Sequence, residues 1–204
     1  MLSINRGFSA PVVIESDRAP ADLALLSAHD DDPFARYEAL QQLMLDTLIA
    51  EASGGTGATD AVVEAMRRTL TDSELDKAFI GEAVLVPSEA FIGDQMPVVD
   101  PEAIHQARER LRAALGRSLE SEWRAAYAST AANRFELTPA AKGARRLRTV
   151  ALGFLFAAKA EDAPKLAWEQ FSGADNMTDR QGALGALVNS EAPEREQALA
   201  AFYD

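Results

Sequence analysis

Histidine spacing is the first test of whether this chain could hold a catalytic metal. A zinc-protease helix carries His-Glu-x-x-His, which places two imidazoles one turn apart on the same face. Here the only histidines are His29 and His105, and there is no cysteine. Thiolate metal sites, disulfides and cysteine nucleophiles are therefore excluded, and two isolated histidines do not support a Ser-His-Asp arrangement. We expect no catalytic, cofactor-binding or metal-binding residue in this chain.

The acidic run "HDDDPF" could offer oxygen ligands to a hard cation from Asp30, Asp31 and Asp32. It lacks the spaced ligands and the glycine of a calcium loop. An aspartate directly before Pro33 is also what a helix N-terminus prefers. We therefore interpret this run as a helix cap.

The glycine-rich stretch "SGGTGAT", residues 53–59, could in principle cradle a phosphate. A phosphate loop would continue with Lys-Ser or Lys-Thr, and neither follows here. A flexible surface linker is the better interpretation.

Two basic clusters stand out in an acidic chain. They contain Arg108, Arg110, Arg112 and Arg117, and Lys142, Arg145, Arg146 and Arg148. The second cluster lies mainly off the apolar stripe of its helix, with Arg145 almost opposite that stripe. A solvated face whose charges pair with nearby carboxylates is the simpler interpretation. The alternative is that these cations line a cavity that attracts anions.

The polar stretch "GADNMTD", residues 173–179, sounds like a site but is followed at once by an amphipathic pattern. Thr178 is a suitable N-cap, and Asp179 would then occupy the first turn, where the helix dipole favours an anion. Asp175 and Asn176 would hold the preceding turn through side-chain-to-backbone bonds. The local pattern predicts a helix start rather than an active site.

Composition limits the possible partners. The chain has 204 residues, of which 48% are hydrophobic and 25% charged, and its net charge is −12. It is long enough to bury a core and too apolar to be disordered. So acidic a chain argues against nucleic acid and anionic membranes as partners. No apolar run spans a bilayer and no signal peptide is recognisable, so we expect a cytoplasmic location.

Hydrophobic periodicity predicts a mainly α fold of irregular stacked helical pairs, an α-solenoid-like superhelix. Pro33 begins a helix in which apolar residues recur at helical spacing as far as Leu48. The predicted helices cover 20–30, 33 to about 50, 60–70, 72–80, 88–95, 101–129, 139 to about 160, 163–172, 177–189 and 193–203.

Residues 1–15 differ from this pattern because they are rich in strand formers, among them Leu2, Ile4, Phe8, Val12, Val13 and Ile14. They predict a short N-terminal β segment, a hairpin or two strands. Such a piece is barely stable without a partner sheet, which the rest of the chain does not supply. The chain also stops on a helix, so both ends look truncated.

Four segments, in order, carry a family resemblance: "LSINRGFSAPV" (2–12), "DDPFARYEALQQL" (31–43), "VVDPEAIHQARERLRAAL" (98–115) and "FSGADNMTDRQGALGAL" (171–187). Together they resemble bacterial aminopeptidase N, a family of zinc-dependent metallopeptidases. In that family a β-domain and a thermolysin-like catalytic domain precede a small β-sandwich and a large helical domain. The resemblance assigns residues 1–15 to the last strands of the sandwich and 20–204 to the first part of the helical domain.

The resemblance also implies a function for the parent enzyme, which would remove N-terminal residues from peptides with the help of zinc. The family's zinc ligands and catalytic residues lie in its catalytic domain, so none can be assigned to a residue here. This part would be a structural cover over the active-site chamber, inactive alone. Its partners would be the catalytic and β domains of the same polypeptide, and peptide substrates. The alternative is a free-standing helical-repeat module that binds another protein.

Overall fold

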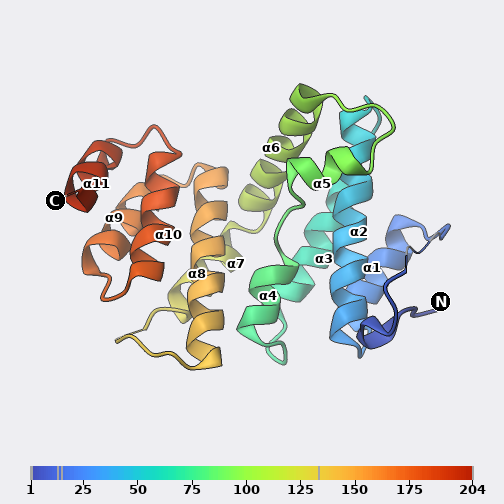
Figure 1. The fold of residues 1–204 in the computed structure, drawn as a ribbon, viewed down its shortest axis with the longest axis horizontal. Coiled ribbons are helices and arrows are strands. Elements are labelled where there is room, and N and C mark those ends of the chain that lie inside the picture. Colours follow the sequence, from blue (N-terminus) through green and yellow to red (C-terminus); the bar gives the residue numbers. More distant parts are fainter. Residues whose placement is uncertain (1, 13, 15, 133, 204) are drawn as a thin grey trace. The chain divides into compact units, whose positions relative to one another are not determined.

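The computed structural model describes residues 2–12, 14, 16–132 and 134–203, and Figure 1 shows that its regular structure is helical. These residues form eleven α-helices and one short 3₁₀ helix, and no strand occurs among them. The elements are η1 (Arg6–Phe8), α1 (Pro20–His29), α2 (Pro33–Ala52), α3 (Thr59–Thr71), α4 (Lys77–Ala83), α5 (Glu89–Asp94), α6 (Pro101–Ser118), α7 (Glu120–Ser129), α8 (Pro139–Ala158), α9 (Ala163–Gly173), α10 (Met177–Val188) and α11 (Glu194–Tyr203).

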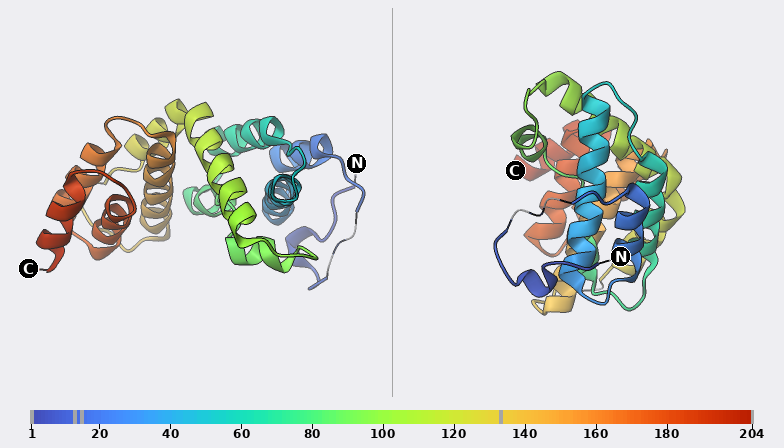
Figure 2. Two further views of the ribbon diagram at one scale, coloured as in Figure 1. Left: turned by 90° about the horizontal axis from the view of Figure 1, so that it is seen from above. Right: turned by 90° about the vertical axis from the view of Figure 1, so that its right-hand side faces the viewer.

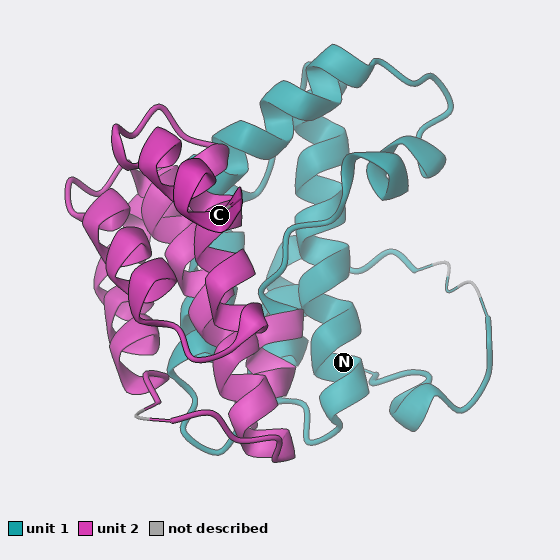
Figure 3. Ribbon diagram, turned by 60° about the vertical axis from the view of Figure 1, so that its left-hand side comes forward, with its two compact units in different colours: residues 1–75, 83–114 teal, residues 76–82, 115–204 magenta. Residues whose placement is uncertain are grey.

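Consecutive helices pack against each other in pairs, α1 with α2, α7 with α8 and α9 with α10. The prediction of a mainly α, repeat-like fold is therefore confirmed. The chain divides into two compact units, residues 1–75 with 83–114 and residues 76–82 with 115–204, which Figure 3 colours separately.

The predicted N-terminal β segment is not seen in residues 2–12 and 14, whereas Val13 lies outside the described residues. The chain instead forms η1, the dark-blue turn in Figure 2, which packs against α2. Asn5, Gly7 and Phe8 have φ angles of 56°, 61° and 53°. These values belong to the left-handed region, which a β-strand cannot include. The strand prediction is wrong here because local turn geometry prevails over strand propensity.

Polar and aromatic contacts hold this segment against the start of α2 instead of a sheet. The Gly7 amide donates to Asp32 Oδ1 at 3.1 Å, and Arg6 bonds to Asp30 at 3.1 Å. The rings of Phe8 and Phe34 lie 5.2 Å apart between centroids. These contacts, and not pairing with other strands, hold the N-terminal segment on its own unit.

The first unit is centred on α2, whose apolar stripe is buried as predicted. Leu40, Leu43, Met44 and Leu48 have no exposed surface. Each such side chain contributes about 1.5–3 kcal/mol by leaving water. Val62 and Met66 of α3, Ile92 of α5 and Ile104 of α6 are buried in the same unit.

The second unit is centred on α8, where Leu147, Val150, Ala151, Phe154 and Leu155 are buried as the periodicity predicts. Trp123 of α7 stacks on Phe154, with ring centroids 4.2 Å apart and planes 6° from parallel. Its indole N–H donates to the Leu115 carbonyl at 3.2 Å, so the buried polar atom is satisfied.

Two predicted helix boundaries are corrected. The helix expected over 101–129 is interrupted at Leu119, whose φ of −121° and ψ of 23° are not helical. The helix expected over 72–80 begins only at Lys77. Asp72 and Asp76 each accept a hydrogen bond from the amide two residues later, at 3.0 and 2.7 Å, so turns precede the helix.

Candidate functional site

The two histidines lie apart from each other in separate polar contacts. His29 Nε2 lies 3.1 Å from Arg68 Nη1, and His105 Nδ1 lies 2.8 Å from Glu89 Oε1. The hydrogen bond to Glu89 raises the pKa of His105. No group of three His, Asp or Glu residues that could hold a metal occurs in the part of the chain that the structure describes. These residues do not fit a zinc site; that the chain holds no zinc stays a prediction.

The aspartates of "HDDDPF" are engaged by the protein itself. Asp32 accepts from the Ala35 amide at 2.8 Å and caps α2, which confirms the capping interpretation. Backbone hydrogen bonds from Ala35 and Gly7 lower the pKa of Asp32. The hydrogen bond from Arg6 lowers the pKa of Asp31. This run is therefore a helix start that also anchors the N-terminal segment.

In the glycine-rich loop 53–59, close packing and a positive φ angle explain why glycine is needed at two positions. A Cβ on Gly57 would lie 2.6 Å from Thr47 Cγ2, and Gly54 has a φ of 81°. Glu51, at the end of α2, accepts hydrogen bonds from Thr59 at 3.1 Å and Arg110 at 3.4 Å. A wide hollow of about 400 Å³ lies beside the loop.

In the "GADNMTD" stretch the residue that caps α10 is Asn176, so the prediction of a Thr178 cap is wrong. Asn176 Oδ1 accepts from the Asp179 amide at 3.0 Å, and Thr178 is exposed inside the helix. Asp179 does lie in the first turn, as predicted. Asp175 Oδ2 accepts from the Phe135 amide at 2.7 Å, a contact made 40 residues away rather than within the local turn.

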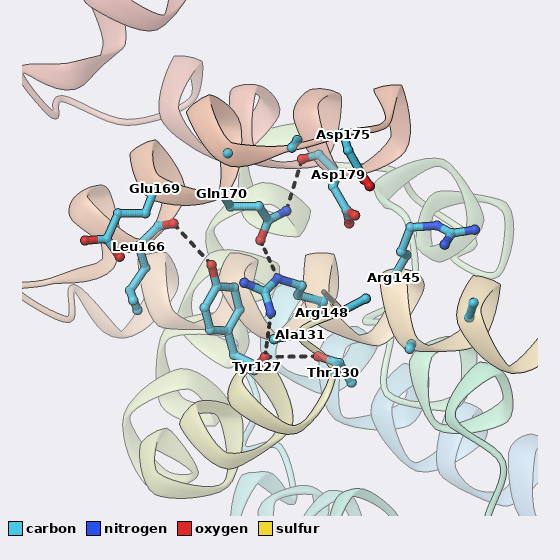
Figure 4. A pocket seen from close by; sticks show the side chains of 15 residues that line it. Tyr127, Thr130, Ala131, Arg145, Arg148, Leu166, Glu169, Gln170, Asp175 and Asp179 are labelled. Carbon is cyan, nitrogen blue, oxygen red and sulfur yellow. Dashed lines mark hydrogen bonds between the residues drawn. The ribbon is translucent and has the colours of Figure 1, made fainter. Parts of the chain in front are cut away.

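A cavity of about 310 Å³ opens beside this stretch, among α7, α8, α9 and α10 (Figure 4). Arg148 crosses it and is held on three sides. Its Nε donates to Gln170 Oε1 at 2.9 Å, its Nη1 donates to the Tyr127 carbonyl at 3.1 Å, and its guanidinium lies 4.1 Å from the Tyr127 ring centroid. Gln170 Nε2 donates onward to the Asp179 carbonyl at 3.0 Å. This network fixes one cation in a defined position.

Tyr127 contributes an aromatic wall to the cavity rather than an acid or base. Its hydroxyl donates to the Leu166 carbonyl at 3.1 Å, and burial raises its pKa. The phenol is therefore neutral at ordinary pH and already hydrogen-bonded. The cavity is equipped for binding by hydrogen bonds and charge, not for nucleophilic chemistry.

The second basic cluster is split between the surface and the cavity. Arg146 is exposed and bonds to Glu82 at 2.7 Å, as expected for a solvated face. Arg145 is only 6% exposed, so the interpretation of a solvated residue is wrong for it. Its Nη1 donates to the Glu136 carbonyl at 2.9 Å, and its guanidinium lies 4.8 Å from the Phe135 ring centroid. The apolar stripe of α8 gave no sign that Phe135 and Glu136 would cover Arg145.

The other cluster, on α6, behaves as the simpler interpretation predicts. Arg110 pairs with Glu51 at 3.4 Å and Arg112 pairs with Glu109 at 2.8 Å. Arg108 is more buried, and its Nε donates to the Pro87 carbonyl at 2.9 Å. Desolvation by burial lowers the pKa of Arg108.

Fold and sequence together define the class of this chain as a helical-repeat domain. Residues 20–204 match the family described as "Domain of unknown function (DUF3458_C) ARM repeats", and the chain belongs to that family.

The relatives of the chain are named Aminopeptidase N. The chain is 34% identical to the one from Caulobacter vibrioides, with 100% of this chain and 24% of the relative covered. It is 31% identical to the one from Escherichia coli, with 97% and 23% covered. A crystal structure of Legionella pneumophila aminopeptidase A in complex with aspartic acid has the same fold, with a TM-score of 0.84 over 98% of this chain and 25% of that one, at 24% identity. The chain thus spans about a quarter of the length of the relatives it matches.

Proposed function

We propose that this chain is the non-catalytic helical part of a longer zinc-dependent aminopeptidase, where it covers the chamber that holds peptide substrates. The observation that carries the proposal is the match of the whole chain to about a quarter of a longer Aminopeptidase N, at 34% identity. A match of this extent supports one domain of a larger enzyme. The catalytic and β domains of the same polypeptide are then the partners of this domain.

The number and placement of possible zinc ligands in the sequence support a non-catalytic role. A zinc peptidase needs clustered ligands and an activated water. The chain has two histidines and no cysteine, and each histidine has its own polar partner in a different place. Zinc would accordingly be bound by another part of the enzyme, and a β-sandwich domain would precede this helical part. We also propose a cytoplasmic location; no helix among the described residues is long and apolar enough to cross a membrane.

The alternative is a free-standing helical-repeat module that binds a protein partner. The description of the matched family as ARM repeats favours a repeat architecture. Such an architecture offers extended surfaces for binding. A free-standing module would not, however, account for the similarity of the whole chain to part of an aminopeptidase.

The first test is an activity assay on the purified 204-residue chain. It is expected to release no product from aminoacyl anilides or dipeptides, with or without added zinc. Turnover that persists through repurification and scales with the amount of this chain would contradict the proposal.

The second test addresses the chamber. A chimera in which this chain replaces the matched quarter of the Escherichia coli relative is expected to hydrolyse a dipeptide anilide as the parent does. The ratio of kcat/KM between a ten-residue and a two-residue peptide is expected to change, because a wall governs access rather than chemistry. If a folded chimera keeps that ratio unchanged, the chamber role is wrong.

A further inference from the structure

The cavity of the second unit has unlike charges on facing walls. Arg145 and Arg148 extend from α8, while Asp175 and Asp179 lie at the start of α10 (Figure 4). No ion pair within 4.0 Å joins these groups in the part of the chain that the structure describes. The Asp179 carboxylate points from α10 toward the space between the two arginines. Both signs of charge therefore line one cavity.

The cationic wall is ordered before any ligand arrives. Arg148 is fixed by Gln170, by the Tyr127 carbonyl and by the Tyr127 ring, and neither its bond to Gln170 nor its bond to that carbonyl uses Nη2. Arg145 is held by the hydrogen bond that its Nη1 donates to the Glu136 carbonyl and by the Phe135 ring, a bond that leaves Nε and Nη2 unused. Donors already held in place lose little conformational entropy on binding. Guanidinium N–H groups of this kind suit a carboxylate.

The anionic wall offers acceptors that the protein does not fully use. Asp179 Oδ2 accepts from Asn176 Nδ2 at 2.7 Å, but Asp179 Oδ1 is buried and has no hydrogen-bond partner. A buried acceptor without a donor is costly. An N–H group placed in the cavity would relieve that cost after a small side-chain movement.

The two walls together restrict the chemistry of an occupant. A simple anion would be repelled by Asp175 and Asp179, and a simple cation by Arg145 and Arg148. A group with a carboxylate on one atom and an N–H on the next satisfies both walls at once. A volume of about 310 Å³ holds something of the size of one or two amino-acid residues.

We propose that this cavity binds the carboxylate and neighbouring N–H group of an amino acid, either free or at the C-terminal end of a peptide. Arg145 and Arg148 would bind the carboxylate, and Asp179 would accept from the N–H. This site goes beyond the proposed function, because it is a binding site within the helical domain itself. Its test measures binding to this chain and does not depend on peptide hydrolysis.

The test is calorimetric titration of the 204-residue chain with four probes. L-Alanine represents the free amino acid and N-acetyl-L-alanine the end of a peptide, whereas acetate lacks the N–H and N-acetyl-L-alanine amide lacks the carboxylate. At least one of the first two is expected to bind about tenfold more tightly than acetate and the amide, since each loses one of the two contacts. Whichever of the two binds more tightly identifies the source.

Variants locate the site. Arg145→Lys and Arg148→Lys keep the charge but lose the guanidinium fork, and each is expected to weaken binding about tenfold. Arg146→Lys is the matched control, because Arg146 lies on the same helix but pairs with Glu82 at the surface, so binding should stay unchanged. Asp179→Asn, which keeps an acceptor for Asn176, should weaken alanine binding more than acetate binding.

Three results would overturn the proposal. One is the absence of heat from both alanine probes at concentrations up to about 10 mM. Another is acetate binding as tightly as alanine, which would indicate an adventitious anion only. The third is an equal loss in the Arg146→Lys control. Circular dichroism of every variant establishes that it is folded, and Arg145→Lys and Asp179→Asn remain informative if Arg148→Lys is not.

Discussion

Asn176, at the start of α10, caps the helix and also binds two neighbouring carboxylates, whereas Thr178 does neither. Its side chain accepts from the Asp179 amide and donates to the Asp175 and Asp179 carboxylates. Asn176→Ala is therefore expected to lower the free energy of unfolding by about 1–2 kcal/mol, toward the upper range for a lost cap. Thr178→Ala, at an exposed site inside the helix, should cost less than about 0.5 kcal/mol. Urea denaturation of both variants measures the difference, and equal losses would show that the cap is misassigned.

For individual residues, the sequence predicted the start of α10 but not which residue caps it. Asn176 and Thr178 are both good caps, and local propensity does not choose between them. The choice follows from the bond between Asp175 and the Phe135 amide, which fixes where the chain turns. A contact across 40 residues leaves no periodic signal. The burial of Arg145 was missed for a similar reason, since its contacts come from Phe135 and Glu136, outside its helix.

Gly116, near the end of α6, allows α6 and α8 to approach each other closely. A Cβ at this position would lie 2.6 Å from the Phe154 carbonyl oxygen and 2.7 Å from the Ala158 nitrogen. Both are backbone atoms, so the helices must shift, and Gly116→Ala is expected to destabilise the fold by about 1–3 kcal/mol. Gly153→Ala on α8 is the control, since its Cβ meets nothing within 4 Å. That change should stabilise by about 0.4–1 kcal/mol. Thermal denaturation followed by circular dichroism distinguishes the two; a neutral Gly116→Ala would contradict the close approach.

Arg124 of α7 bonds to Asp162, which precedes α9, through two contacts of 2.8 Å. The hydrogen bond from Arg124 lowers the pKa of Asp162, so the pair stabilises the fold above the ordinary aspartate pKa. That contribution is lost as pH falls through the lowered folded-state pKa. Because the side chains are 38% and 46% exposed, we expect Arg124→Met to cost only about 0.5–1 kcal/mol at pH 7.

The pH dependence is the sharper test of this pair. The difference in unfolding free energy between the original chain and Arg124→Met should shrink as pH falls below about 4, as Asp162 becomes protonated. Denaturant titrations at neutral and acidic pH measure it. A difference that is constant with pH would mean that packing, and not the ion pair, accounts for the effect.

Helix existence was predictable and helix interruption was not. The buried stripes of α2 and α8 follow from spacing that the sequence shows directly. The break at Leu119 does not, because leucine is a good helix former and the nearby Gly116 lies within α6, three residues before the break. The break lets Leu119 stay fully buried next to Trp123, also fully buried. Packing has overridden propensity here.

At the scale of the whole molecule, several large apolar side chains are exposed. Leu2 is 72% exposed and Tyr203 is 96% exposed, and Phe8, Val12 and Phe202 also contact solvent. We expect the purified chain to self-associate with rising concentration through these ends, since exposed apolar patches promote association. Leu2→Ser with Tyr203→Ser should reduce the association measured by light scattering without lowering the melting temperature. Leu25→Ser, at a third exposed site, is the control.

The two tryptophans of the chain, Trp123 and Trp168, both lie in the second unit, whose bounds are given above. Trp123 is fully buried and stacked on Phe154, and Trp168 lies beside Phe171, with ring centroids 5.8 Å apart. The tryptophan fluorescence of this chain, excited selectively over tyrosine, is therefore an optical signal from one half of it. Far-ultraviolet dichroism, in contrast, reports on the helices of both. If the two signals change at the same denaturant concentration or temperature, the two units unfold together. If they change separately, the stability of each unit can be measured without an added label.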